Sequence, residues 1–264
     1  MNEQVRAEAV ALLLQAYRTG APIDPLTSLF DGLQIDDAYA IQVDQVNQWR
    51  RDGAVVKGHK VGLTSAVMQR QIGVDQPDFG HLTDRMFFSE AGVIDAGTFL
   101  QPKVEPEIGF LLGKSLKGPG VTAEEAAEAV SAVVPALEII DSRIRDWKIT
   151  IVDTIADNAS SGGVVLGSKF TALSDVDVRE VVGTLTLNGE VVGTGVGSAV
   201  LGSPLNALVW LANVLGERGV TLEAGHVVLP GSITAAVPVE PGDVVTAKFE
   251  GLGSVTARFG RSAR

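Results

Sequence analysis

Two glutamates separated by a single residue are the side chains with the clearest chemical potential in this sequence. Glu105 and Glu107 share one parity in the segment KVEPEIGFLL, residues 103–112, and the apolar residues Val104, Ile108, Phe110 and Leu112 share the other. Alternate side chains of a β-strand point to the same face, and two residues span about 6.6 Å, so both carboxylates can reach one ion about 2.1 Å from each oxygen. The spacing predicts an oxygen-ligated divalent metal site. The alternative is a strand whose glutamates face solvent.

A third carboxylate is available in the segment ALEII, residues 136–140. Glu138 has apolar neighbours on both sides there, and burial of an ionised glutamate is costly unless the group is paired or binds a metal. Three carboxylates would leave coordination positions open for substrate and water. The alternative for Glu138 is an ion pair with Arg143 or Arg145.

Lys60 and Asp78 are candidates for proton transfer. Lys60 lies in the apolar, glycine-flanked segment GHKVGLT, residues 58–64, where desolvation would lower its pKa and suit it to acid–base catalysis. Asp78 lies in PDFG, residues 77–80, which predicts a turn. Each has an ordinary alternative: an ion-paired or surface-covering lysine, and an aspartate that caps a turn.

The other polar motifs predict no chemistry of their own. His59, His81 and His226 lack the spacing of metal ligands, so we interpret them as structural. The glycine-rich residues 193–197 lack the strand–glycine–helix order of a dinucleotide site and predict a turn or bulge. The sequence contains neither a phosphate-binding P-loop motif nor the G-x-S-x-G motif of serine hydrolases.

Composition excludes several classes of function. The chain has 264 residues, of which 45% are hydrophobic, enough for a full core. With 21 Lys and Arg against 32 Asp and Glu, the net charge of -11 has the wrong sign for nucleic acid or anionic lipid. Cysteine is absent, so any metal must be held by oxygen or imidazole. We find no signal peptide and no apolar stretch of about 20 residues, and we therefore expect a cytoplasmic protein that does not enter a membrane.

Helical periodicity predicts the elements of the N-terminal part and two later helices. Residues 1–52 are expected to be helical, with Asp36 as the N-cap of the second half. Thr122 and Glu125 form a capping box that starts another helix, which should end before Pro135. Ser203, followed by a proline, begins a third helix that runs until about residue 219.

Strands joined by turns dominate the rest of the chain. Asn188-Gly189 between two alternating segments predicts a type I′ hairpin, and two further turns, at residues 241–243 and 251–253, flank a predicted strand. We therefore expect an α+β protein with a mixed, mainly antiparallel sheet. An N-terminal helical portion, residues 1–54, would precede a metal-binding catalytic core, residues 55–264, in one continuous structural unit.

Several segments together resemble the hydratase and decarboxylase family within the fumarylacetoacetate hydrolase superfamily. The matching residues are 58–64, 73–80, 104–108, 136–147, 152–160 and 231–259. The resemblance implies a barrel-like core of fumarylacetoacetate hydrolase type and a site for Mg²⁺ or Mn²⁺. It also implies a cytoplasmic homo-oligomer that can associate with other enzymes of aromatic catabolism.

The resemblance assigns roles to particular residues. The metal-binding carboxylates fall on Glu105, Glu107 and Glu138, the catalytic lysine on Lys60 and the acidic group for hydration on Asp78; the substrate contacts fall on Leu63 and Ser160. The implied reaction adds water to 2-hydroxypenta-2,4-dienoate and gives 4-hydroxy-2-oxopentanoate. In it, Lys60 or Asp78 assists protonation at C5, and Asp78 activates the water that attacks C4.

The choice of hydratase depends mainly on Asp78, because the related 4-oxalocrotonate decarboxylases tend to carry an apolar residue at that place. Residues 142–147 also resemble the hydratases, whereas residues 231–238 and 251–259 are at least as similar to the decarboxylases. Three alternatives therefore stay open: a 4-oxalocrotonate decarboxylase, a catalytically silent partner subunit, and an enzyme that hydrolyses a C–C bond of an acylpyruvate.

Overall fold

A computed structural model describes residues 1–261 of the chain, except for the side chains of residues 68, 71 and 72. The α-helices are α1 (Glu3–Thr19), α2 (Leu26–Leu29), α3 (Ile35–Arg51), α4 (Ala66–Ile72), α5 (Ala123–Ala129), α6 (Ile151–Ala156) and α7 (Pro204–Glu217). The strands are β1 (Val56–Gly62), β2 (Asp78–Thr83), β3 (Phe87–Phe88), β4 (Ile94–Asp95), β5 (Lys103–Leu112), β6 (Val130–Ile140), β7 (Ser161–Leu166), β8 (Val182–Leu187), β9 (Glu190–Val196), β10 (Val227–Leu229), β11 (Val237–Pro238), β12 (Val244–Phe249) and β13 (Gly253–Gly260). Short 3₁₀ turns include η3 (Arg145–Trp147) and η4 (Asn158–Ser160).

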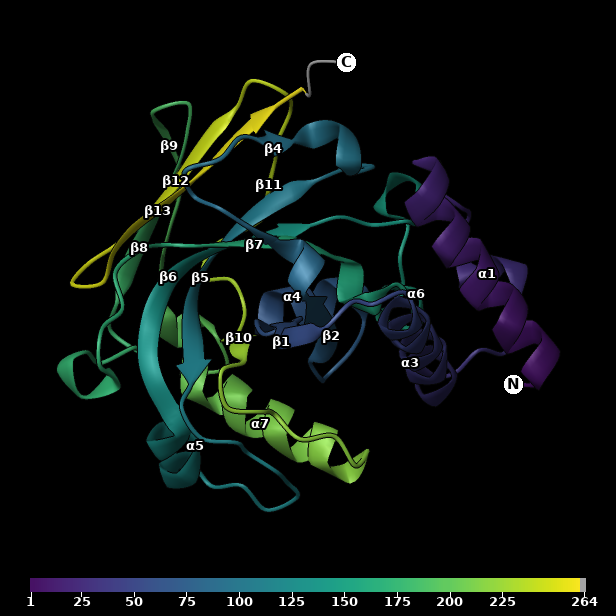
Figure 1. Cartoon of the computed structure of the whole chain (residues 1–264), viewed down its shortest axis with the longest axis horizontal. Helices are drawn as coiled ribbons and strands as arrows, with labels where there is room; N and C mark the ends of the chain where they lie inside the picture. The colour runs from purple at the N-terminus through teal and green to yellow at the C-terminus, as the bar shows by residue number, and fades with distance from the viewer. Residues whose placement is uncertain (262–264) are drawn as a thin grey trace.

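The larger of two sheets carries the candidate site. Its strand order is β2-β1-β10-β5-β6-β7-β3, and the short strand β11 also pairs with β5. Antiparallel pairs predominate, while β1–β10 and β3–β7 are parallel. The long strands β5 and β6 curve through the centre of the molecule (Figure 1). The predicted α+β fold with a mixed, mainly antiparallel sheet is confirmed.

The second sheet packs against the first. It has the order β4-β13-β12-β8-β9, and strands β12 and β13 contact β6. The side chains that face inward from β12 and β13 are apolar and buried, including Val245, Phe249 and Val255. Two curled sheets thus enclose one core, and the outer edge of the second sheet lies far from α1 (Figure 1).

The N-terminal helices lie beside the β2 end of the larger sheet. Gln42 of α3 is buried, and its side-chain amide donates hydrogen bonds to the carbonyls of Phe79 and Ile155, both at 2.9 Å. Gln45 donates in the same way to the Ala156 carbonyl at 2.6 Å. Buried amides on α3 therefore fix this helix to β2 and α6. The division of the chain after residue 54 stays a prediction, and residues 262–264 of the predicted core lie outside the described residues.

Local signals in the sequence predict most helix and turn boundaries correctly. Thr122 caps α5, and its hydroxyl accepts a hydrogen bond from the Glu125 amide at 3.2 Å. Ser203 caps α7 immediately before its first residue, a proline. Asn188 and Gly189 both have positive φ, 54° and 89°, as a type I′ hairpin between β8 and β9 requires.

One local prediction was wrong, and another was confirmed in part. The N-cap of α3 is Gln34 rather than Asp36, because the Asp37 carboxylate accepts a hydrogen bond from the Gln34 amide at 3.0 Å and completes the cap two residues earlier. Residues 193–196 continue strand β9 and do not form a turn, but the register of β9 with β8 shifts at Gly193, which agrees with the bulge that was the other prediction for this segment. Glycine is needed there because a Cβ at Gly195 would meet the Ile233 carbonyl oxygen at 1.9 Å.

Helix α7 also corrects the expectation that no apolar stretch approaches the length of a membrane span. The stretch Gly197–Glu217, which ends with α7, has 21 residues and a mean hydropathy of 1.4. By length and composition it is therefore long and apolar enough to cross a membrane. Core helices pass the same test, and α7 buries Leu208, Leu211 and Leu215 inside this molecule. It lies across one end of the larger sheet (Figure 1).

Candidate metal centre and active site

Strands β5 and β6 bring the three predicted carboxylates together. Glu105 is directly opposite Glu138 in the antiparallel ladder, and Glu107 follows on the same face of β5. One carboxylate oxygen from each residue lies within 4.8 Å of the others. The exposed fractions are 6% for Glu105, 0% for Glu107 and 1% for Glu138. The alternative of solvent-facing glutamates on this strand is therefore wrong.

The three carboxylates repel one another when they are ionised and no cation lies between them. Burial and the nearby Glu138 carboxylate raise the pKa of Glu105 to about 7. Burial, together with both other carboxylates, raises the pKa of Glu107 well above its ordinary value. Burial also raises the pKa of Glu138, although the Lys60 ammonium partly offsets this effect. A divalent cation would relieve the repulsion and favour the ionised form of all three groups.

The hydrogen bonds of these acids leave ligand positions free. Glu107 Oε2 accepts a hydrogen bond from the Gly231 amide at 2.7 Å. Glu107 Oε1 and both oxygens of Glu138 are buried and accept no hydrogen bond within the described part of the chain. Oxygens about 2.1 Å from an octahedral Mg²⁺ lie about 3 to 4 Å from one another, compatible with the observed cluster. The donor set and its spacing fit a hard divalent cation.

Lys60 lies on β1 at the side of this cluster. Its Nζ is 3.3 Å from Glu138 Oε1, and the side chain is buried. Burial lowers the pKa of Lys60, but the surrounding carboxylates, Glu138 and Asp78 foremost, outweigh burial and raise the pKa above its ordinary value. The predicted lowered pKa was therefore wrong, because a local segment does not reveal how many acids the fold gathers around it. Lys60 is an ammonium group in a position to donate a proton.

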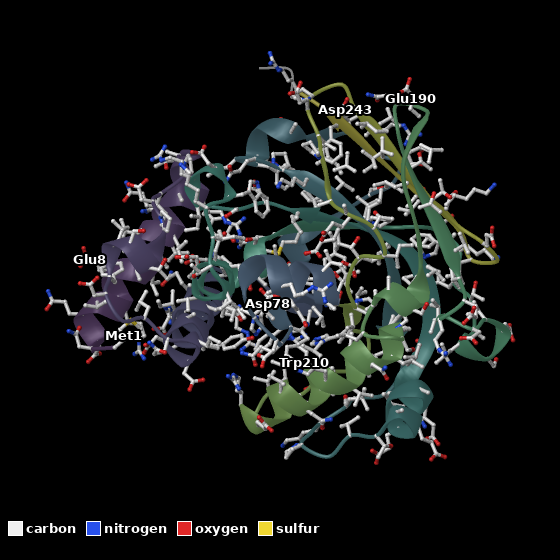
Figure 2. All side chains as sticks on the ribbon, turned by 180° about the vertical axis from the view of Figure 1, so that it is seen from behind. Met1, Glu8, Asp78, Glu190, Trp210 and Asp243 are labelled. Carbon is white, nitrogen blue, oxygen red and sulfur yellow. The ribbon has the colours of Figure 1, made fainter. Side chains whose placement is uncertain are left out.

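Asp78 lies on the opposite side of Lys60 from Glu138. It begins strand β2 rather than a turn, because its backbone pairs with Gly62 across the β1–β2 ladder. Asp78 Oδ2 accepts a hydrogen bond from the Thr154 hydroxyl at 3.5 Å, while the buried Oδ1 has no partner among the described residues. Burial raises the pKa of Asp78, and Lys60 lowers it in part. Figure 2 shows Asp78 in the interior, above Trp210 of α7.

The residues implied in substrate contact, Leu63 and Ser160, line a cavity of about 260 Å³ together with Lys60, Asp78 and Glu105. The cavity is also lined by residues that sequence reasoning missed: Lys103, Thr154 and Trp147, with the apolar side chains Val61, Ile140, Ile149, Ala159, Ala235 and Ala236. Lys103 could have been found, since it shares the strand parity of the two glutamates on β5. Thr154 and Trp147 have no such local signal.

A left-handed turn carries Ser160 into the cavity. Asn158, Ala159 and Ser160 have φ values of 53°, 51° and 52°, a conformation that costs about 1–2 kcal/mol per residue for L-amino acids. The Asn158 side chain compensates by pairing with both backbone groups of His81, at 2.8 and 2.9 Å. The turn places Ser160 Oγ 3.3 Å from the Thr154 hydroxyl, which in turn contacts Asp78. Three polar side chains thus form one chain at the cavity wall.

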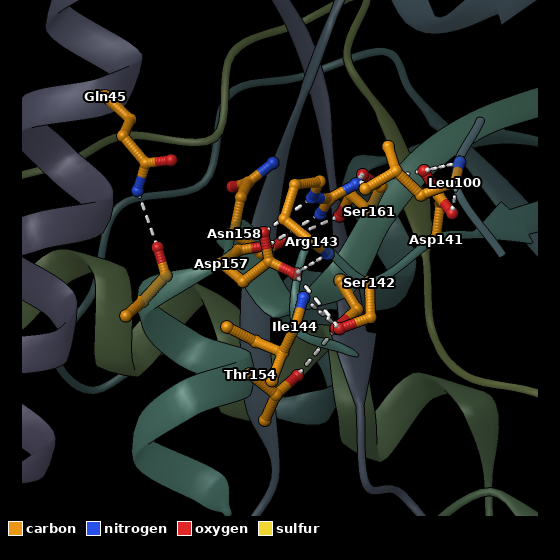
Figure 3. Close-up of polar contacts among 12 residues, drawn as sticks. Gln45, Leu100, Asp141, Ser142, Arg143, Ile144, Thr154, Asp157, Asn158 and Ser161 are labelled. Atoms are coloured by element: carbon orange, nitrogen blue, oxygen red, sulfur yellow. Dashed lines mark hydrogen bonds and ion pairs between the residues drawn. The ribbon is translucent and has the colours of Figure 1, made fainter. Parts of the chain in front are cut away.

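The arginines proposed as alternative partners of Glu138 are occupied elsewhere. Arg143 is fully buried, and its Nε donates to Asp157 Oδ1 at 2.6 Å (Figure 3). Its Nη1 lies 3.7 Å from Asp141 Oδ2. Arg145 forms an exposed ion pair with Asp24. The ion-pair alternative is therefore wrong, and Arg143 instead joins the end of β6 to the turn that carries Ser160.

The three histidines gather on the reverse face of β1, since His59 is adjacent to Lys60 in the strand. The ring centroid of His59 is 4.9 Å from that of His81 and 5.7 Å from that of His226. Burial lowers the pKa of His81 to about 4. In the described part of the chain, the three glutamates are the group whose ligand atoms are close enough to hold a metal.

Comparisons with known proteins agree with this geometry. Residues 58–260 match the family model described as fumarylacetoacetate (FAA) hydrolase C-terminal. The 2-keto-4-pentenoate hydratase of Paraburkholderia xenovorans (strain LB400) is 49% identical over 261 residues, which cover 98% of this chain and 96% of that protein. The 4-oxalocrotonate decarboxylase of Pseudomonas putida is 39% identical over 263 residues, which cover 98% of this chain and all of that protein.

Solved structures also match most of the chain. The 4-oxalocrotonate decarboxylase from Pseudomonas putida G7, complexed with magnesium and adipate, aligns with a TM-score of 0.94 and 39% identity over 98% of both chains. Fumarylpyruvate hydrolase from Pseudomonas aeruginosa, in complex with Mn²⁺ and pyruvate, aligns with a TM-score of 0.64 and 18% identity over 79% of this chain and 91% of that one, which shows a shared fold. The chain therefore belongs to the fumarylacetoacetate hydrolase family.

Proposed function

We propose that the protein is a divalent-metal-dependent hydratase that converts 2-hydroxypenta-2,4-dienoate into 4-hydroxy-2-oxopentanoate. The observation that carries this proposal is a set of three buried carboxylates within 4.8 Å of one another beside a cavity that also contains Lys60 and Asp78. The 49% identity to a 2-keto-4-pentenoate hydratase over almost the whole chain supports the same reaction.

Glu105, Glu107 and Glu138 would hold the metal, and we propose Mg²⁺ or Mn²⁺ because relatives are described with magnesium or manganese. When bound, such an ion polarises the oxygen at C2 of the substrate as a Lewis acid. The side chains of this protein then donate and accept the protons. The Lys60 ammonium, whose pKa is raised, donates a proton to C5 as the dienol becomes a 2-oxo-3-enoate, and the amine so formed takes up the proton that leaves the C2 hydroxyl.

Asp78 acts in the second step. Its carboxylate accepts a proton from water as the oxygen adds to C4, and the carboxylic acid so formed then donates that proton to C3. The Oδ1 atom suits this role because it is buried without a partner, while Thr154 holds Oδ2. Leu63 and Ser160 would contact the substrate from the cavity wall.

A decarboxylase is the second candidate, since the structure of the 4-oxalocrotonate decarboxylase from Pseudomonas putida G7 aligns with a TM-score of 0.94. The presence of a buried carboxylate at position 78, beside Lys60, favours hydration over loss of CO₂. We also propose that the chain works in the cytoplasm as a homo-oligomer, and that it can associate with other enzymes of the same catabolic route. Light scattering coupled to size-exclusion chromatography tests the homo-oligomer.

A steady-state assay of the purified protein with Mg²⁺ tests the function. Loss of dienoate absorbance without CO₂ release is expected, and Asp78→Asn should abolish most of this activity while Mg²⁺ still binds. CO₂ release from 4-oxalocrotonate would instead support the decarboxylase. Absence of turnover on either compound would contradict both activities and support a silent partner subunit.

A further inference from the structure

Two ammonium groups line the cavity, and they differ in their partners. Lys60 is paired with Glu138 at 3.3 Å. Among the residues that the structure describes, no carboxylate lies within 4.0 Å of Lys103 Nζ. Lys103 therefore brings a positive charge without an ion-pair partner to a cavity whose other charged side chains are mainly acidic, although Glu105 lies close enough to act on that charge.

The strand places this charge at the rim of the metal centre. Lys103 is the first residue of β5, two positions before Glu105, so both side chains point to the same face. Lys103 is half-buried, whereas Glu105 is 6% exposed. An anion that entered the cavity from solvent would meet Lys103 before it reached the three glutamates.

Trp147 holds the ammonium group in place without neutralising it. Lys103 Nζ lies 4.3 Å from the centroid of the Trp147 ring, which is a cation–π contact. The indole is fixed in turn, because its Nε1 donates to the Gln101 carbonyl at 3.1 Å. Asp146 and Trp147 also have positive φ, 57° and 55°. Consecutive strained residues of this kind are found where a structure fixes a functional side chain.

The charge of the cavity favours a positive group beside an anionic ligand, because one divalent ion and Lys60 do not balance the carboxylates there. Four carboxylates, those of Asp78, Glu105, Glu107 and Glu138, surround the reacting end, and Lys60 is already paired with one of them. We propose that Lys103, positioned by Trp147, binds the carboxylate of a short 2-oxo or 2-hydroxydienoate acid and so determines specificity for carboxylate substrates. The identity of this ligand rests on the proposed function, but the anion site itself rests on the charge and position of Lys103.

The test compares two probes that differ only in the carboxylate. Isothermal titration of the Mg²⁺-loaded protein would measure binding of 2-oxopentanoate, an unreactive saturated acid, and of neutral pentan-2-one. Loss of a charge-assisted hydrogen bond weakens binding about 10- to 100-fold. Lys103→Gln should therefore raise the Kd of 2-oxopentanoate by about that factor and leave pentan-2-one unaffected, while Lys103→Arg should restore part of the affinity.

Two controls separate this role from a structural one. Lys114→Gln removes an exposed lysine that pairs with Glu128 and should change neither Kd. Lys103→Gln should also leave Mg²⁺ affinity undiminished, because it removes a positive charge near the ion. In turnover of the dienoate, the variant should show a raised KM with a smaller change in kcat.

Distinct outcomes overturn the subsite and the proposed reaction. An unchanged Kd for 2-oxopentanoate in Lys103→Gln would overturn the carboxylate subsite, even if the wild-type protein hydrates the dienoate. Loss of Mg²⁺ binding in parallel with loss of the acid would also overturn it, since Lys103 would then act by supporting Glu105. A wild-type protein without turnover that still loses the acid upon Lys103→Gln would support the subsite and contradict only the hydratase.

Discussion

Replacement of Gly62 by alanine tests whether the position of Asp78 controls the reaction. Gly62 ends β1 and pairs with Asp78 across the β1–β2 ladder. A Cβ atom at Gly62 would lie 2.2 Å from Asp78 Oδ1 and 3.3 Å from Lys60 Nζ. The φ of Gly62 is outside the left-handed region, so alanine fits the backbone. The conflict therefore falls on the two groups proposed to move protons.

The structure sets the size of this effect. Real Cβ atoms essentially never approach another heavy atom within 3.0 Å, so Asp78 Oδ1 must withdraw by about 1 Å. A misplacement of about 1 Å in a catalytic constellation costs about 10²-fold in rate, which is ~2.7 kcal/mol in the activation free energy. We expect kcat/KM of Gly62→Ala to fall by about that factor. Mg²⁺ affinity should persist, because the three glutamates lie on β5 and β6.

The assay follows dienoate absorbance in the wild type, Gly62→Ala and the control Gly92→Ala. A Cβ at the half-buried Gly92 meets the Ser89 carbonyl oxygen at 3.4 Å, an ordinary contact, so this control should be fully active. Asp78→Asn should cost less in the Gly62→Ala background than in the wild type, because both changes disable the same group. A Gly62→Ala variant with wild-type kcat/KM would refute the reasoning.

Three further predictions concern the metal and the buried charges. Glu107→Gln should weaken Mg²⁺ binding at least about 10-fold in isothermal titration through loss of an anionic ligand; unchanged affinity would contradict its role. In the folded protein the pKa of Glu105 is about 7, against an ordinary value of 4.5. Between pH 4.5 and pH 7 the folded chain therefore binds more protons than the unfolded chain. With the metal removed by EDTA, the free energy of unfolding should fall as the pH rises through this range. Urea unfolding at both pH values measures this loss, which saturating Mg²⁺ should cancel; a flat profile in EDTA would count against the raised pKa. Arg143→Met leaves Asp157 buried without its partner and should lower the free energy of unfolding in urea by about 3–5 kcal/mol. The control Arg145→Met removes an exposed ion pair and should lower it by less than about 1 kcal/mol. Equal losses in the two variants would contradict the difference between the buried and the exposed ion pair.

The sequence predicts the clustering of the three glutamates well because strand parity is a local property. Glu105 and Glu107 share a face of β5 in any strand conformation. Glu138 was recognisable from the cost of burying a carboxylate among apolar neighbours. The fold adds the register of β5 against β6, which aligns Glu105 with Glu138. Capping and turn chemistry are equally local, and they predicted α5, α7 and the β8–β9 hairpin.

The remaining features depend on contacts between distant segments. Asp78 was expected in a turn, but pairing with β1 makes it part of a strand. The pKa of Lys60 is raised rather than lowered because three separate strands bring acids to it. The position of Trp147 follows from two residues in the left-handed region, which no local propensity for aspartate and tryptophan would predict. Such strain is maintained by the surrounding structure and is therefore invisible in a short segment.

A crystal grown with Mn²⁺ tests the central claim most directly, because anomalous scattering locates that ion without ambiguity. We predict a single strong peak enclosed by oxygens of Glu105, Glu107 and Glu138 at about 2.1–2.2 Å, with open positions toward the cavity. A map without a peak among these three carboxylates at saturating Mn²⁺ would contradict the metal centre and the reaction proposed for it.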